Sequence, residues 1–161
     1  MTPYRIGHGY DVHRLVPDRP LYLGGVRIPY SLGLLGHSDA DCLLHAVMDA
    51  VLGALGEGDI GRHFPDSDEA YRDIDSKKLV LRVAGLMRRR GYAIGNIDAT
   101  VVAQKPKLSP FIEEMRQAIA GLFGCEAELV NVKATTEEGL GFTGRGEAIS
   151  AHAVCLLVSQ K

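Results

Sequence analysis

Residues 4–13 read "YRIGHGYDVH", and the interpretation of the whole chain starts from this stretch. Alternate positions in its first part carry large side chains, as one face of an extended strand would: Tyr4, Ile6, His8 and Tyr10. Gly7 and Gly9 have the opposite parity and leave room beside the strand. The sequence therefore predicts a strand over residues 4–10.

Asp11 and His13 lie two residues apart at the end of this stretch. In an extended segment they project to the same face, with their Cα atoms about 6–7 Å apart. The pair supplies two metal ligands, and His45 is the best candidate for a third, with Asp41 or Asp49 one helical turn away to orient its other ring nitrogen. Two histidines and a carboxylate are typical of catalytic zinc. Spacing alone leaves open that they are an ordinary surface carboxylate and two ordinary histidines.

The remaining periodicity predicts an α+β fold. Helices are expected after Ser38, over residues 76–90 and from Ser109-Pro110, ending at Gly56, Gly91 and Gly124. Further strands are expected at 21–28, 96–103, 129–134 and 148–158. Because strands and helices interleave, the sheet should be mixed, with helices packed on one face.

The first helix carries a second expectation. Ser38 and Asp41 have the spacing of a capping box, so Ser38 should cap the helix. The stretch "GHSDAD" at 36–41 would then place free backbone N–H groups beside His45. A helix N-terminus attracts anions, so this arrangement suits a phosphate or diphosphate next to a metal ion.

Composition limits the class of protein. A length of 161 residues fits one domain, 1–161, and a net charge of −2 argues against non-specific nucleic-acid binding. No apolar run approaches the ~20 residues that span a bilayer, and the first residues lack the apolar core of a signal peptide. The three cysteines have no CxxC spacing. We therefore expect a cytoplasmic protein with reduced thiols and no membrane partner.

Five motifs, in order along the whole chain, resemble the 2-C-methyl-D-erythritol 2,4-cyclodiphosphate synthase family. They are "GHGYDVHRL", "LGGVRIPY", "GLLGHSDADCLLHAVMDAVLGA", "GDIGRHFPD" and "NVKATTEEGLGFTGRGEAI". The resemblance implies a cyclic homotrimer with active sites between subunits. It implies a phosphorus–oxygen lyase of the non-mevalonate isoprenoid pathway, which converts 4-diphosphocytidyl-2-C-methyl-D-erythritol 2-phosphate to the 2,4-cyclodiphosphate and releases CMP.

The resemblance also implies two metal sites and a catalytic set. Zn²⁺, one per subunit, matches Asp11, His13 and His45, and Mg²⁺ or Mn²⁺ bound with the substrate matches Glu138, beside its rival Glu137. Catalytic roles fall on Thr136, Glu138 and His37.

The substrate contacts that the resemblance implies form four groups. Asp59 and Gly61 match ribose contacts. His37 and Ser38, with Phe64 and Asp66, match the region that binds the methylerythritol phosphate. The positions that match the nucleotide pocket are Ala103, Lys107, Leu108, Ala134, Thr135 and Thr136. Phe142 and Arg145 match a central channel, which in some members holds an isoprenoid diphosphate.

Three positions depart from the family pattern. His63 and Ser109 stand where apolar residues are expected, and Glu137 stands where Thr is expected. Two other functions remain open: a zinc-dependent phosphodiesterase, which would incorporate solvent oxygen, and a non-catalytic protein that binds zinc or an isoprenoid diphosphate.

Overall fold

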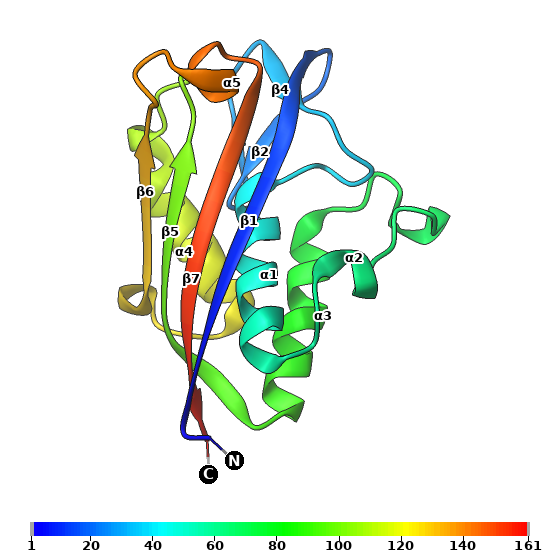
Figure 1. Cartoon of the computed structure of the whole chain (residues 1–161), viewed down its shortest axis with the longest axis vertical. Coiled ribbons are helices and arrows are strands. Elements are labelled where there is room, and N and C mark those ends of the chain that lie inside the picture. Colours follow the sequence, from blue (N-terminus) through cyan, green and yellow to red (C-terminus); the bar gives the residue numbers. More distant parts are fainter. Residues whose placement is uncertain (1, 161) are drawn as a thin grey trace.

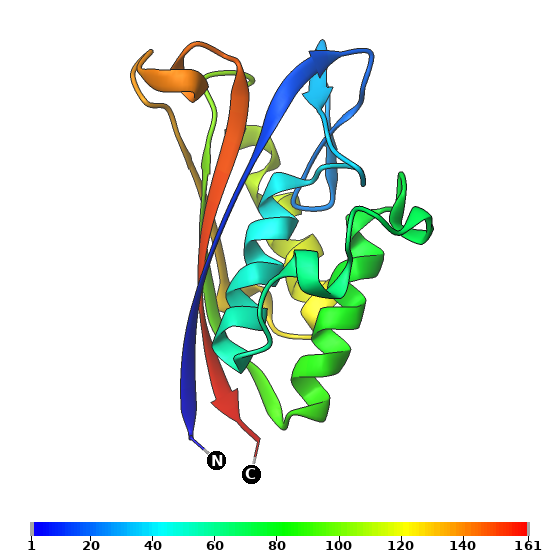
Figure 2. The same cartoon turned by 45° about the vertical axis from the view of Figure 1, so that its right-hand side comes forward.

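A computed structural model describes residues 2–160 and shows one five-stranded sheet with its long helices on one face (Figures 1 and 2). The strands are β1 Tyr4–Pro17, β2 Leu21–Leu23, β3 Val26–Ile28, β4 Leu32–Leu34, β5 Tyr92–Val102, β6 Val130–Thr135 and β7 Ala148–Ser159. The α-helices are α1 Cys42–Leu55, α2 Ile60–His63, α3 Ser76–Arg89, α4 Ile112–Phe123 and α5 Gly141–Gly144. Among residues 2–160, no helix combines the length and apolar character that a membrane crossing requires.

The predicted mixed sheet is confirmed. Its strand order is β4-β1-β7-β5-β6, and β2 and β3 form a separate hairpin. Strand β7 is antiparallel to both β1 and β5, whereas β5 and β6 run parallel. The long antiparallel pair of β1 and β7 runs from Tyr4 opposite Val158 to Arg14 opposite Ala148, and so fixes the register of the residues that follow Gly9.

Helix α1 is the centre of the core. Eleven of its fourteen residues are buried, because the sheet covers one side and α3 another. The contact with β1 is unusually close. A Cβ atom on Gly7 would lie 1.8 Å from the carbonyl oxygen of Ala50, and one on Gly9 would lie 1.8 Å from that of Ala46. Only glycine lets the backbones of β1 and α1 approach this far.

Several helix ends differ from the sequence prediction. Helix α1 begins at Cys42, and its N-cap is Asp41, whose side chain accepts a hydrogen bond from the N–H of Leu44. Ser38 lies in the preceding loop, so the predicted capping box is wrong. Ser109 caps nothing either: it belongs to a 3-10 turn that leads into α4 without a side-chain cap. The predicted ends at Gly56 and Gly124 are confirmed, and both have positive φ.

The strand prediction also needs correction. Residues 21–28 form the hairpin of β2 and β3, with Gly24 and Gly25 in the turn, where one bulged strand was expected. Strand β4 and the short helices α2 and α5 were not predicted. These pieces are too short for periodicity to reveal.

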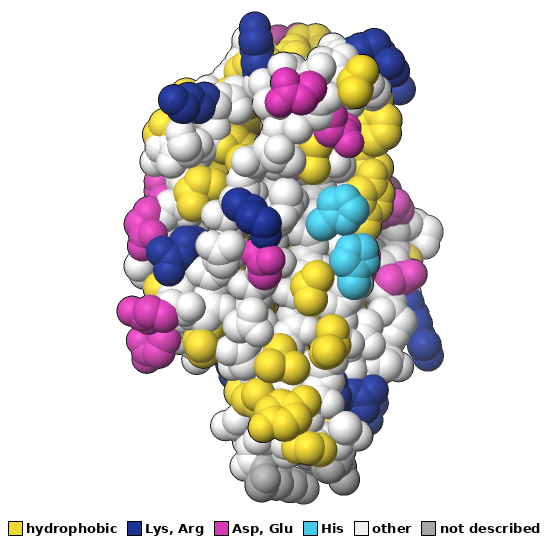
Figure 3. Space-filling model, turned by 60° about the vertical axis from the view of Figure 1, so that its left-hand side comes forward, with side chains coloured by type: hydrophobic (Ala, Val, Ile, Leu, Met, Phe, Trp, Pro, Cys, Tyr) yellow, Lys and Arg dark blue, Asp and Glu magenta, His cyan; other side chains and the backbone are white. Residues whose placement is uncertain are grey.

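The outer face of the sheet carries exposed apolar side chains and no helix (Figures 2 and 3). The exposed large apolar residues of β1 and β7 are Tyr4, Ile6, Tyr10, Val12 and Val154. His8 and His152 lie among them, with ring nitrogens 3.3 Å apart. A sheet face of this composition is typical of a surface that contacts another protein chain.

The close packing of β1 on α1 gives a stability prediction. Gly9→Ala should lower the free energy of unfolding by roughly 3 kcal/mol, because helix backbone must move to admit the methyl group. Gly121→Ala is the control, since Gly121 lies in α4 with nothing within 4 Å of the added Cβ. This control should gain roughly 0.5–1 kcal/mol. Urea unfolding measures both variants, and equal stability of the Gly9 variant and the parent would contradict the close packing.

Candidate functional site

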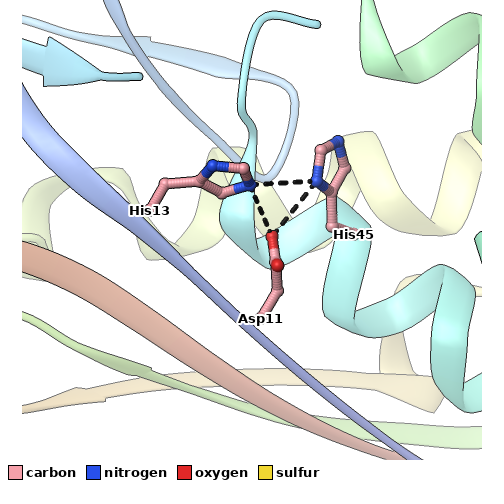
Figure 4. Close-up of side chains that lie close together, drawn as sticks. All are labelled: Asp11, His13 and His45. Carbon is pink, nitrogen blue, oxygen red and sulfur yellow. Dashed lines mark hydrogen bonds and ion pairs between the residues drawn. The ribbon is translucent and has the colours of Figure 1, made fainter. Parts of the chain in front are cut away.

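Asp11, His13 and His45 point toward one another at the side of α1 that faces β1 (Figure 4). Asp11 Oδ2 lies 2.8 Å from His13 Nε2 and 3.1 Å from His45 Nδ1. The two ring nitrogens are 3.3 Å apart. Strand β1 supplies Asp11 and His13 from one face, as their spacing predicts, and the first turn of α1 supplies His45.

The outer nitrogen of each imidazole has a partner. His13 Nδ1 is 2.8 Å from the carbonyl oxygen of Leu35 and must donate to it, because a carbonyl only accepts. His45 Nε2 is 3.0 Å from Ser76 Oγ and 3.3 Å from Ser38 Oγ. The inner nitrogen of His13 therefore directs a lone pair at Asp11 and His45.

The expected partners of His45 are corrected here. Asp49 accepts from the backbone N–H of Ile60 at 2.8 Å, and so ties α1 to α2. Asp41 accepts from the N–H groups of Gly24 and Gly25. Neither carboxylate touches His45. Its orienting groups are serine hydroxyls, which the helical spacing of the carboxylates did not indicate.

These three ligand atoms fit a metal ion. Each has a lone pair directed at the same point, and all three lie within 4.8 Å of one another. Tetrahedral coordination with bonds of about 2.0–2.1 Å puts ligand atoms about 3.3 Å apart, close to the separations here. Three protein ligands leave a fourth position open, which is the arrangement of a catalytic metal site.

The pKa values of the ligands reflect the same contacts. Burial would raise the pKa of Asp11, but hydrogen bonds and charges from His13 and His45 outweigh it and lower this pKa to about 2. Burial would lower the pKa of His13, but the Asp11 carboxylate raises it above its ordinary value. Because a metal ligand must be deprotonated, a metal ion would compete with a proton for His13 at this point.

A pocket of about 240 Å³ opens beside the three ligands. Of the predicted substrate residues, it brings His37, Ser38, Gly61, Phe64 and Asp66 together with the metal cluster. Asp59 does not line this pocket, because its carboxylate caps α2 by accepting from the N–H of Arg62.

The anion site expected at the N-terminus of α1 is not present in the form predicted. The Asp41 carboxylate already accepts from the N–H of Leu44 and from two loop N–H groups. Burial raises the pKa of Asp41 to about 6. A buried acidic side chain at this end of the helix leaves little reason for an anion to bind there.

The predicted nucleotide residues form a second pocket, of about 380 Å³, at the far side of the sheet. It is lined by Ala103, Gln104, Lys105, Pro106, Lys107, Leu108, Ser109, Ala134, Thr135 and Thr136. Asp11 pairs with Ala151, Ala151 with Val101, and Val101 with Ala134. Three strand spacings of about 4.8 Å therefore separate Asp11 from Ala134, or about 14 Å in all. The two pockets share no lining residue.

Comparison with known proteins identifies the family of this chain. Residues 4–158 match the YgbB family. The chain belongs to the YgbB family. It is 65% identical to 2-C-methyl-D-erythritol 2,4-cyclodiphosphate synthase of Trichlorobacter lovleyi, over 97% of this chain and 99% of that protein.

Solved structures agree with this membership. IspF of Plasmodium falciparum, in complex with CDP, has a TM-score of 0.88 at 34% identity and covers 100% of this chain and 99% of its own. The bifunctional IspDF of Campylobacter jejuni has a TM-score of 0.93 at 41% identity, over 97% of this chain and 42% of the longer one.

The neighbouring carboxylates of Glu137 and Glu138 differ in their contacts. Glu137 accepts a hydrogen bond from the hydroxyl of Thr143, a buried residue of α5. Glu138 is exposed and has positive φ, and its N–H contacts Thr136 Oγ1 at 3.3 Å. The Glu137 carboxylate is thus engaged within its own loop, while that of Glu138 faces solvent.

The remaining predicted positions lie in different parts of the structure. Phe142 lines a shallow pocket with Val12 and Ala148 at the outer face of the sheet. Arg145 does not line it and forms an ion pair with Glu147. His63, the last residue of α2, does not line the metal pocket and bonds to the carbonyl of Glu57 at 2.8 Å.

Several residues of the metal pocket in this YgbB chain were not predicted from the sequence. Ile60, Tyr71 and Leu79 line the metal pocket, and apolar periodicity gave them no distinguishing signal. Ser76 was recognised only as the start of a helix, yet it is the nearest partner of His45 Nε2. Its helix-start position and its polar type are the only signals, and many serines share them.

Proposed function

We propose that this protein is a 2-C-methyl-D-erythritol 2,4-cyclodiphosphate synthase. The observation that supports it most is the Asp11, His13 and His45 cluster, which opens onto a pocket in a chain 65% identical to an enzyme of that name. The enzyme converts 4-diphosphocytidyl-2-C-methyl-D-erythritol 2-phosphate to the 2,4-cyclodiphosphate and CMP, and is thus a CMP-forming, cyclising phosphorus–oxygen lyase.

The reaction is an intramolecular phosphoryl transfer. An oxygen of the 2-phosphate bonds to the β-phosphorus, and the bond from that phosphorus to the oxygen leading to CMP breaks. The leaving oxygen keeps the electron pair. Because the attacking phosphate is already anionic, no strong base is needed, and positioning and charge neutralisation dominate the catalysis.

Zinc is the metal we assign to the first site, one ion per subunit. Two imidazoles and one carboxylate with an open fourth position are typical of catalytic zinc, and bound zinc supplies a Lewis acid for a phosphoryl oxygen. His37, Ser38, Phe64 and Asp66 surround the same pocket and hold the methylerythritol phosphate. Gly61 of α2 and Asp59, the N-cap of that helix, contact the ribose.

Glu138 would hold the Mg²⁺ or Mn²⁺ that is bound together with the diphosphate. A hard cation that is bound mainly by phosphates and water needs only one or two carboxylates. The exposed carboxylate of Glu138 suits this role better than that of Glu137, which already accepts from Thr143. Thr136, next to the same turn, donates a hydrogen bond to a phosphate oxygen.

The nucleotide occupies the second pocket. Ala103 and Ala134 leave space for a flat base, while Lys107, Leu108, Thr135 and Thr136 supply polar and apolar contacts. The Plasmodium falciparum relative with the same fold is a complex with CDP, which supports this assignment.

The active sites lie between subunits of a cyclic homotrimer. The cytidyl diphosphate must reach both pockets, yet within one chain β7 and β5 lie between Asp11 and Ala134, which are about 14 Å apart. The exposed apolar face of β1 and β7 offers a surface for assembly. In the trimer, Phe142 and Arg145 line the central channel, which accepts an isoprenoid diphosphate.

We assign residues 1–161 to one cyclodiphosphate synthase domain of the cytoplasm. One buried core runs without interruption from the hairpin of β2 and β3 to β7. The three cysteines are free, in agreement with a reducing compartment.

The function is tested by product analysis. The purified protein with the cytidyl substrate and magnesium should release CMP and the cyclic diphosphate, without solvent oxygen in either product. His45→Ala should lower turnover roughly a thousandfold and lose the bound zinc, since the ion provides several kcal/mol of charge stabilisation. His63→Ala is the control, with zinc and turnover retained. Solvent ¹⁸O in the product would indicate a phosphodiesterase instead, and metal binding without turnover would indicate a binding protein.

The assignment of the second metal predicts a difference between neighbouring carboxylates. Glu138→Gln should lower turnover roughly a hundredfold and raise the magnesium concentration required, because the amide keeps the shape but not the charge. Glu137→Gln should change the magnesium requirement little. CMP affinity without divalent metal should be the same in both variants. Undiminished turnover of the Glu138 variant, or a large loss of its metal-free CMP affinity, would exclude the proposed role.

Shared active sites predict complementation between two inactive chains. Asp11→Ala disables the metal half, and Thr136→Arg blocks the nucleotide half. After the two are denatured, mixed equally and refolded, about a quarter of all interfaces should have both halves intact in a cyclic ring. Activity should rise toward that fraction. Inactive mixed trimers, identified by mass, would show that each site lies within one chain.

A further inference from the structure

We propose that Asp39 is a positioning residue of the metal centre. Through Ser76, it keeps the ring proton of His45 on Nε2 and leaves Nδ1 free to bind metal. This inference rests on the proposed metal site, but it concerns Asp39, for which no role has been assigned above.

Asp39 is tied to the start of α3. One carboxylate oxygen accepts from the backbone N–H of Ser76 at 2.9 Å, and the other accepts from the Ser76 hydroxyl and, at 3.1 Å, from the N–H of Asp41. Ser76 is fully buried, so no solvent water competes for its hydroxyl. The loop before α1 and the first turn of α3 are thus held together at the outer side of His45.

The single hydroxyl proton of Ser76 has one acceptor that outweighs the others. A carboxylate only accepts, and hydrogen bonds to a charged oxygen are roughly twice as strong as neutral ones. The proton therefore points at Asp39, and an oxygen lone pair of Ser76 faces His45 Nε2 at 3.0 Å. His45 must then donate from Nε2, which leaves a lone pair on Nδ1.

This constraint matters because a second carboxylate acts on the other nitrogen. Asp11 Oδ2 lies 3.1 Å from His45 Nδ1 and attracts the ring proton to that position. With the proton there, Nδ1 has no lone pair for a metal ion. The Asp39–Ser76 pair opposes this attraction and favours the tautomer that binds metal.

Ser38 is the competing contact at Nε2. Its hydroxyl oxygen is 3.3 Å from His45 Nε2 and accepts from the N–H of Ala40 at 3.2 Å. Its own proton has no fixed charged acceptor among the described residues, so it can turn toward Nε2 and favour the other tautomer. Its longer distance and the absence of a carboxylate behind it make it the weaker influence.

The test uses Asp39→Asn, whose amide can donate to Ser76 and so turn the serine proton toward His45. Zinc affinity, measured by competition with a chelator, should fall roughly 10–100-fold. Asp49→Asn is the matched control: it removes a charge of the same sign from α1, one turn beyond His45, at a carboxylate that bonds to Ile60. This control should change zinc affinity less than threefold.

Two further measurements separate positioning from a structural effect. In the metal-free protein, ¹⁵N NMR of the imidazole ring should show the His45 proton on Nε2 in the parent and in the Asp49 variant. In Asp39→Asn it should move to Nδ1. Ser76→Ala should lower zinc affinity by a similar factor. The double variant should bind zinc as tightly as the single variant with the lower zinc affinity, because both changes act through one chain of hydrogen bonds.

Each result decides the proposal. An unchanged tautomer in folded Asp39→Asn, a loss of affinity no greater than in Asp49→Asn, or additive losses in the double variant would overturn it. If Asp39→Asn does not fold, the tautomer and affinity of Ser76→Ala decide the proposal in the same way. A parent protein that binds no zinc would overturn the proposed metal site, whereas the metal-free NMR result still reports on Asp39.

Discussion

The close approach of β1 to α1 is the constraint on which the site depends. Without side chains at Gly7 and Gly9, the strand lies against the carbonyl groups of Ala46 and Ala50. The same register then carries Asp11 and His13 past the first turn of α1, where His45 projects. A packing requirement of the core thus sets the ligand distances, because any methyl group between the two backbones would push the strand ligands away from the helix ligand.

The site that results brings several electron-rich ligand atoms close together. It brings together one carboxylate and two imidazole nitrogens that face one another. The lowered pKa of Asp11 and the raised pKa of His13 indicate that a positive charge between them is stabilised. The outer partners decide which positive charge fits. Leu35 holds a proton of His13 on the outer nitrogen, and we propose that Ser76 does the same for His45, so that each inner nitrogen can serve as a metal ligand.

The parts of this site that follow strand or helix periodicity were predictable from the sequence. Asp11 and His13 share a face because strands alternate, and His45 belongs to a helix that its apolar stripe and its terminal glycine both indicate. The partners of His45 were not predictable in the same way. Asp49 and Asp41 have the right helical spacing but bond to backbone groups of other segments, whereas Ser76 arrives from a helix thirty-one residues further along the chain. Contacts of this kind are set by tertiary packing, which leaves no periodic trace.

Two strands of the sheet separate the two halves of the proposed reaction site. Asp11 of the metal pocket and Ala134 of the nucleotide pocket lie on one row of the sheet, and buried Ala151 of β7 and Val101 of β5 stand between them. In the proposed assembly a second chain supplies the other half of each site, and the exposed apolar residues of β1 and β7 offer that chain a surface. In the proposed trimer each chain carries one half of two neighbouring sites, in keeping with a sheet whose long helices cover one face and leave the other for a neighbour (Figure 2).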